Sequence, residues 1–117
     1  MNDIKLMNKA ADNIRILAAS MVEKAKSGHP GGAMGGADFV NVLFSEFLVY
    51  DPKNPAWEGR DRYFQDPGHM SPMLYSVLAL AGKFTIDELK EFRQWGSVTP
   101  GPVSYTHLRA HETLMNL

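Results

Sequence analysis

The residues of this sequence best suited to chemistry are two histidines, each set in a loop that contains glycine. His29 lies in the run Ser27-Gly-His-Pro-Gly-Gly-Ala-Met-Gly-Gly-Ala-Asp38, which holds five glycines. Glycine lets the backbone adopt positive φ and approach a ligand closely, while Pro30 stiffens the turn beside His29. An imidazole has an ordinary pKa of about 6.5 and exchanges protons near neutral pH. Such a run suits a diphosphate-bearing ligand.

The second histidine repeats this design. The run Pro67-Gly-His-Met-Ser-Pro72 places His69 after Gly68 and just before a predicted helix. The free N–H groups and the dipole at a helix N-terminus favour anions. A single glycine-rich loop often only connects two elements. Two loops of one design favour a functional role over a simple connection.

Two helices are predicted around the first loop. Residues 3–26 carry apolar side chains at helical spacing, which indicates an amphipathic helix that delivers His29 to its loop. A second helix is expected from Gly36 or Ala37 through Phe47, apolar around most of its circumference and therefore largely buried. Asp38 in its first turn suits the helix dipole or a ligand.

The second loop also has predicted elements on both sides. Residues 62–65 (Arg-Tyr-Phe-Gln) are aromatic and bounded by turn formers, which predicts a short buried strand that ends at His69. A buried helix should follow over 73–81, with Ser71 as N-cap and Pro72 at N1, closed by Gly82. A capping box over 85–88 predicts a last helix through Leu89, Phe92 and Trp95 that stops near Gly96.

Several motifs in this order and spacing closely resemble transketolase. They are Ser27-Gly-His-Pro-Gly31, Arg60-Asp-Arg-Tyr63, Gly68-His69 leading into Met73–Leu78, Phe92-Arg-Gln-Trp-Gly-Ser97 and Thr99-Pro-Gly101. The resemblance covers residues 1–101, and the conjunction of motifs is specific although each alone is weak. It implies the N-terminal part of a thiamine diphosphate-binding α/β domain, mostly helical here with the one short buried strand.

The resemblance also implies an activity. Transketolases bind thiamine diphosphate with a divalent cation, Mg or Ca, and move a two-carbon ketol unit between sugar phosphates in the pentose phosphate pathway. Their active sites lie between the subunits of a homodimer. The resemblance implies a catalytic and substrate-binding role for His29 and a cofactor-binding role for His69 and Gly68. The metal ligands and the glutamate that activates the cofactor would lie further along a complete transketolase.

Alternatives remain open for individual residues. Either histidine could be a satisfied structural residue, and Met70 departs from the common Gly-His-Gly pattern of the family. Arg93 could be a solvated charge or could lie at a subunit interface.

The resemblance ends abruptly after Gly101. A transketolase would continue Thr-Pro-Gly-His-Pro-Glu, whereas this sequence reads Thr-Pro-Gly-Pro-Val, so the third active-site histidine is missing. Residues 103–113 resemble the in-frame translation of a transposase-end sequencing adapter. We therefore expect residues 1–101 to be a truncated cofactor-binding domain and residues 102–117 to be a non-native tail. His107 and His111 have the i, i+4 spacing of a metal pair, but within such a tail that spacing has no selected function.

Composition narrows the class of protein. The 117 residues suffice for one small domain, carry a formal net charge of −1 and include no cysteine. Nucleic-acid binding, a disulfide scaffold and a membrane span are not expected, and a cytoplasmic enzyme fits best. The alternatives are another thiamine diphosphate-dependent synthase, of the dihydroxyacetone or deoxyxylulose phosphate type, and a non-catalytic truncated binding module.

Overall fold

A computed structural model describes residues 2–100, and within that range the chain is helical and contains no β-strand. The long helix α1 (Ile4–Ala25) confirms the helix predicted over residues 3–26. Its buried stripe follows the 3.6-residue period and consists of Ala11, Ile14, Ala18 and Met21. The helix stops at Lys26, whose left-handed backbone (φ 56°) turns the chain toward His29.

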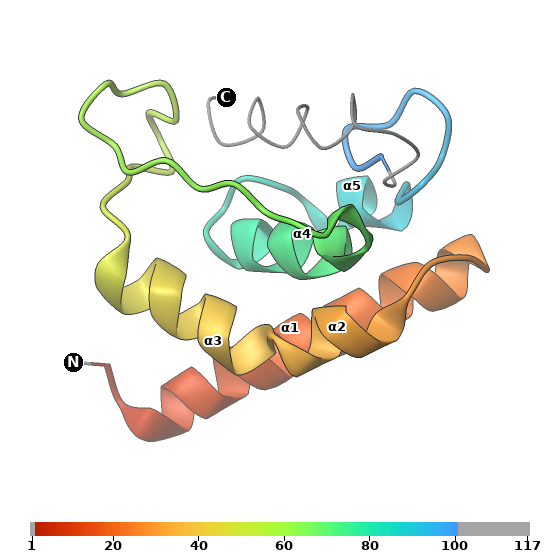
Figure 1. Ribbon diagram of the computed structural model, residues 1–117, viewed down its shortest axis with the longest axis horizontal. Helices are drawn as coiled ribbons and strands as arrows, with labels where there is room; N and C mark the ends of the chain where they lie inside the picture. The colour runs from red at the N-terminus through yellow and green to blue at the C-terminus, as the bar shows by residue number, and fades with distance from the viewer. Residues whose placement is uncertain (1, 101–117) are drawn as a thin grey trace.

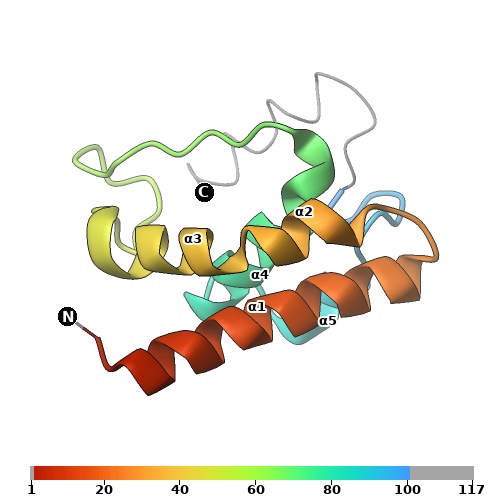
Figure 2. The same ribbon diagram turned by 60° about the horizontal axis from the view of Figure 1, so that its bottom comes forward.

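The glycine-rich run is helical, which differs from the predicted loop. Helix α2 (Pro30–Gly35) begins directly after His29, and α3 (Ala37–Val42) follows it and continues into a π-helical turn, η1 (Leu43–Phe47). The three segments run back along α1 (Figures 1 and 2). Proline suits a first helical turn, and tertiary contact overrides the low helix propensity of glycine.

The second predicted helix is only half buried, so the expectation that it is largely buried was wrong. Val40 and Phe44 are buried, but Phe39 and Phe47 expose 67% and 69% of their surface. The described part of the chain packs against one side of α3 and η1, where α1 and α4 (Ser71–Leu80) lie. No described element covers the side that carries Phe39.

The predicted strand over residues 62–65 is absent. These residues belong to the long connection over residues 48–67, which passes across α4 without regular structure (Figure 1). Phe64 is 63% exposed, whereas Gln65 is buried. A strand needs a neighbour to accept and donate its ladder hydrogen bonds, and the described residues supply none.

Helix α4 forms the centre of the core. A 3₁₀ turn, η2 (Gly68–Met70), leads into it, and every residue from Ser71 to Leu78 is buried. The expected cap differs, because the helix starts at Ser71 itself and its side chain makes no capping hydrogen bond. Gly82, with φ +95°, follows the helix as predicted.

Helix α5 (Ile86–Lys90) begins with the predicted capping box, in which Thr85 and Glu88 exchange side chain-to-backbone hydrogen bonds. It ends earlier than predicted. Phe92 is buried, but Arg93 adopts φ 64° and Trp95 is fully exposed. The backbone N–H of Arg93 donates to the carbonyl of Thr99 at 3.0 Å, so a hydrogen bond to a residue further along the chain replaces the next helical turn. None of the helices in residues 2–100 has the length and apolar character of a membrane span.

Candidate active site

His29 and His69 lie together although forty positions separate them in the sequence. Their ring centroids are 5.0 Å apart and their planes are tilted by 55°. His29 occupies the N-cap position of α2, and His69 lies in η2 just before α4. Both residues are exposed. The fold therefore brings the two predicted site histidines to one place on the surface, where a ligand can reach both.

Glycines in α2 allow this approach. A Cβ added to Gly32 would lie 2.9 Å from Met70 Cγ, and one added to Gly36 would lie 2.6 Å from Met73 Sδ. Gly32 and Gly36 are four residues apart, so they lie on one face of the helical segment and let it pack closely on η2 and α4. Gly31 and Gly35 lie elsewhere on the segment, with nothing within 4 Å of an added Cβ. Met70, the departure from the family pattern, fills this contact.

The turn before His29 also requires glycine. Gly28 has φ +117°, a conformation that other residues rarely adopt. An added Cβ would lie 3.2 Å from Arg93 Nη1, 3.4 Å from Val22 Cγ2 and 3.6 Å from Phe92 Cε2. The turn is thus enclosed by α1 and by the segment after α5. Sequence reasoning missed this contact of Arg93, and only the tertiary structure reveals it.

The residues around His69 fit a diphosphate group. Gly68 is buried and carries no side chain, and the 3₁₀ turn that it begins leads into the ten-residue helix α4, whose dipole is positive at this end. The Ser71 hydroxyl is buried and has no hydrogen-bond partner among the described residues. Donors, a helix dipole and an imidazole are the groups that bind phosphate oxygens in proteins.

Asp38 has a structural partner. Arg15 Nη1 donates to Asp38 Oδ2 at 2.9 Å, and this pair ties α3 to α1. Nη2 of the same guanidinium donates to Asp12 Oδ1 at 2.7 Å. Both carboxylates raise the pKa of Arg15, and the hydrogen bond to Asp38 raises it more than the one to Asp12. The interpretation of Asp38 as a structural residue agrees with this contact. Within residues 2–100 no group of three potential metal ligands is present, and His107 and His111 lie outside the described residues.

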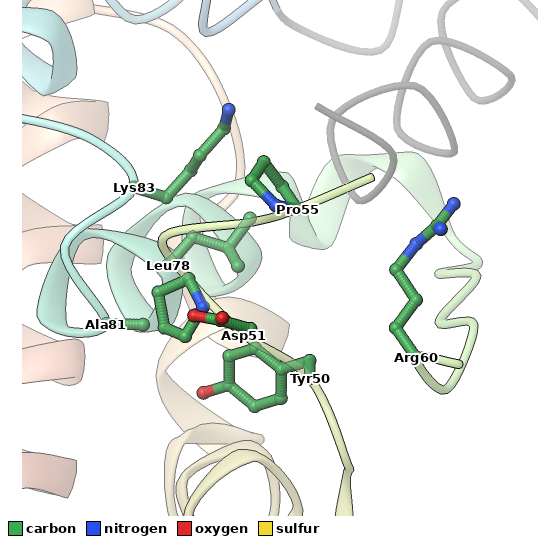
Figure 3. Close-up of a pocket in the computed structure, with 8 residues that line it drawn as sticks. Tyr50, Asp51, Pro55, Arg60, Leu78, Ala81 and Lys83 are labelled. Atoms are coloured by element: carbon green, nitrogen blue, oxygen red, sulfur yellow. The ribbon is translucent and has the colours of Figure 1, made fainter. Parts of the chain in front are cut away.

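A separate small cavity lies between the connection and the C-terminal end of α4 (Figure 3). Its volume is about 30 Å³, and Tyr50, Pro55 and Leu78 form part of its wall. Figure 3 shows the Lys83 and Arg60 side chains extending away from the Tyr50 ring on different sides. Neither histidine lines this cavity, so the histidine pair remains the candidate active site.

Comparison with known families supports the resemblance that the sequence motifs indicate. Residues 6–115 match the family described as transketolase, thiamine diphosphate binding domain. The chain is 50% identical over 101 residues to transketolase-1, chloroplastic, of Arabidopsis thaliana, covering 85% of this chain and 14% of that protein. It is 53% identical over 97 residues to the transketolase of Buchnera aphidicola subsp. Baizongia pistaciae, covering 82% and 15%. The chain thus spans about one-seventh of the length of these relatives.

Solved structures agree at the level of the fold. The transketolase from Leishmania mexicana superposes with a TM-score of 0.78 at 46% identity, covering 81% of this chain and 14% of that one. The transketolase from Campylobacter jejuni gives a TM-score of 0.80 at 43% identity, covering 92% and 17%. Both similarities extend over most of the described residues.

Proposed function

This chain belongs to the transketolase family, and from that premise we propose that it is part of a longer protein, the parent protein, which transfers a two-carbon ketol unit from a ketose phosphate to an aldose phosphate. The observation that carries the proposal is the pair of exposed histidines, His29 and His69, whose rings lie 5.0 Å apart. The identity of about half of the aligned residues to transketolases favours this activity over the other thiamine diphosphate-dependent synthases.

Each histidine has a distinct role in this proposal. His69 and Gly68 bind the diphosphate of thiamine diphosphate, because they lie at the N-terminal side of α4 where anions are favoured. When bound, the cofactor would supply the electron sink for cleavage of the ketose. His29 binds the substrate at the exposed N-cap of α2 and holds or releases a proton at a hydroxyl or carbonyl oxygen.

The remaining features of the proposal concern the parent protein. It binds a divalent cation, Mg or Ca, through residues beyond the described part of this chain. It forms a homodimer, acts on sugar phosphates of the pentose phosphate pathway and works in the cytoplasm. Its cofactor-binding domain has an α/β fold, and the described helices are one portion of it. Exposed apolar side chains such as Phe39 support additional covering structure.

The function is tested with the purified parent protein, thiamine diphosphate and Mg²⁺. Xylulose 5-phosphate and ribose 5-phosphate are supplied, and sedoheptulose 7-phosphate is the expected product. The substitution His29→Ala should lower kcat by about a hundredfold, a typical contribution of a proton-transferring residue. Absence of the seven-carbon product from a folded, cofactor-loaded protein would refute transketolase activity.

We also propose that residues 102–117 are a non-native tail and that residues 1–101 belong to the cofactor-binding domain. The loss of the Thr-Pro-Gly-His-Pro-Glu motif after Gly101 supports this proposal. The family match, which extends to residue 115 and so includes much of the tail, argues against it. The test is to amplify the source locus from a primer within codons 85–95 and to sequence beyond codon 101. A reading frame that continues with His-Pro-Glu supports the proposal. A genomic Tyr-Thr-His-Leu-Arg segment followed by a stop codon contradicts it and favours a short binding module.

A further inference from the structure

Arg93 combines two unusual features. It is one of two non-glycine residues with positive φ among residues 2–100, the other being Lys26, and its φ of 64° lies in the left-handed region that residues with a Cβ rarely adopt. Its side chain is half-buried and makes no ion pair with any described carboxylate. A strained backbone that carries a half-buried cation indicates a specific use of the side chain.

The backbone of Arg93 is fixed by its surroundings. Its N–H donates to the carbonyl of Thr99 at 3.0 Å, and Thr99 is fully buried. The preceding residue, Phe92, is 2% exposed and packs edge-on against Tyr75 of α4, with ring centroids 6.1 Å apart. These contacts anchor Arg93 to the core, so its guanidinium starts from a rigid base.

The guanidinium lies against the turn that carries His29. Nη1 of Arg93 is 3.2 Å from the point where a Cβ of Gly28 would lie, which places the planar group against the Gly28 backbone. Val22 and Phe92 contact the same point at 3.4 and 3.6 Å. His29 follows Gly28 directly and is exposed, so the Gly28 turn sets where its ring lies.

We propose that Arg93 is a positioning residue for His29. Its guanidinium covers Gly28 and holds the turn between α1 and α2, which keeps the His29 ring 5.0 Å from the His69 ring. This inference rests on the function proposed above, because it assigns to Arg93 a part in the chemistry of His29. It predicts that Arg93 affects catalysis through His29 and leaves the cofactor-binding residues unchanged.

The experiment is a double-mutant cycle in the parent protein. Arg93→Gly removes the guanidinium while the new glycine accepts φ 64° without strain. Lys26→Gly is the matched control, because Lys26 has φ 56° and its ion-pair partner among residues 2–100 is the exposed Glu23. Arg93→Gly should lower kcat/KM for the ketose about tenfold, since small displacements of a catalytic group are costly. In the His29→Ala background the same change should alter kcat/KM by less than about twofold.

Two readouts do not depend on turnover. The affinity for thiamine diphosphate, measured by quenching of protein fluorescence, should change by less than about twofold in Arg93→Gly. The ¹³Cε1–Hε1 resonance of His29, identified by its loss in His29→Ala, should shift in Arg93→Gly and stay in place in Lys26→Gly. Arg93→Lys, which keeps the charge but not the planar group, should shift the resonance as Arg93→Gly does.

Several outcomes would overturn the proposal. A tenfold loss that persists in the His29→Ala background would mean that Arg93 acts independently of His29. An equal fall in cofactor affinity would mean a general structural role, and an unmoved His29 resonance would mean that Arg93 does not hold the turn. If the wild-type parent protein forms no ketol-transfer product, the proposed function fails, while the resonance still reports on the contact itself.

Discussion

At the scale of single residues, the close approach of the two histidines depends on the glycines of α2 that pack against a neighbouring element. Gly32 and Gly36 contact Met70 and Met73, whereas Gly31 faces open space. Sequence alone could not separate these glycines, because all of them read as loop formers. Because their surroundings differ, we predict opposite effects of an alanine substitution at Gly32 and at Gly31.

Gly32→Ala should disturb the site, and Gly31→Ala should not. The new Cβ at residue 32 would lie 2.9 Å from Met70 Cγ, so Met70 must move and η2 with it. We expect a lower melting temperature and weaker binding of thiamine diphosphate to the parent protein. Gly31→Ala should leave the binding unchanged and stabilise α2 by about 0.5–1 kcal/mol through reduced backbone entropy.

Calorimetry and a fluorescence titration of both variants check this pair. Equal cofactor affinity in the two variants would contradict the account of the α2–η2 contact. A large destabilisation by Gly31→Ala would mean that another part of the parent protein packs on that position.

Tyr75 predicts a dependence of stability on alkaline pH. Burial raises the pKa of its phenol well above the ordinary value, and its hydroxyl donates to the carbonyl of Pro100 at 2.6 Å. The folded state therefore keeps a proton that the unfolded chain releases above about pH 10. The free energy of unfolding should fall as the pH rises beyond that value, because the folded state binds more protons.

Tyr75→Phe isolates this effect. The variant loses the hydrogen bond to Pro100 and should be less stable by about 1 kcal/mol at pH 8. Its stability should then decline less steeply between pH 10 and 11 than that of the wild type. Parallel curves from urea unfolding at each pH would refute the assignment to Tyr75.

At the scale of elements, local signals located most of the helices, and contacts with residues outside the helices set their ends. The apolar period of α1 and the capping box of α5 are short-range patterns, and both predictions were confirmed. The strand over residues 62–65 and the extension of α5 to Trp95 were wrong. A strand requires a partner strand, and α5 stops where Arg93 bonds to Thr99.

The capping box supplies the prediction at this scale. In Thr85→Ala the backbone N–H of Glu88 loses its acceptor, so the protein should be destabilised by about 1 kcal/mol. Thr85→Ser keeps a hydroxyl in the same place and should retain most of the stability. Chemical unfolding of the two variants compares them directly, and equal losses would refute a capping role.

At the scale of the whole molecule, the described residues leave several large apolar side chains uncovered. The most exposed of these are Ile4, Ile16, Phe39, Phe47, Phe64 and Trp95. The relatives are about seven times longer, so most of the structure that would surround these residues has no counterpart in this chain. Exposed apolar surface promotes association.

The 117-residue chain made alone should therefore bind a hydrophobic dye and elute from a sizing column ahead of a monomer. Replacing Phe39 and Phe47 by serine should reduce both effects, because these side chains are 67% and 69% exposed. Serine at the buried Leu74 is the control and should increase dye binding by unfolding the core. A monomeric wild-type chain that binds no dye would contradict this picture.

The residue types and their order were enough to predict which side chains could do chemistry and where most helices begin. Both follow from short-range physics: residue type sets acid–base behaviour, and apolar period and capping residues set helices over a few turns. Three features became visible only in the folded protein: the glycine-rich run is helical, the His29 and His69 ring centroids lie 5.0 Å apart, and Arg93 covers Gly28. These features arise from contacts between residues far apart in the chain, whose energies outweigh local backbone preferences.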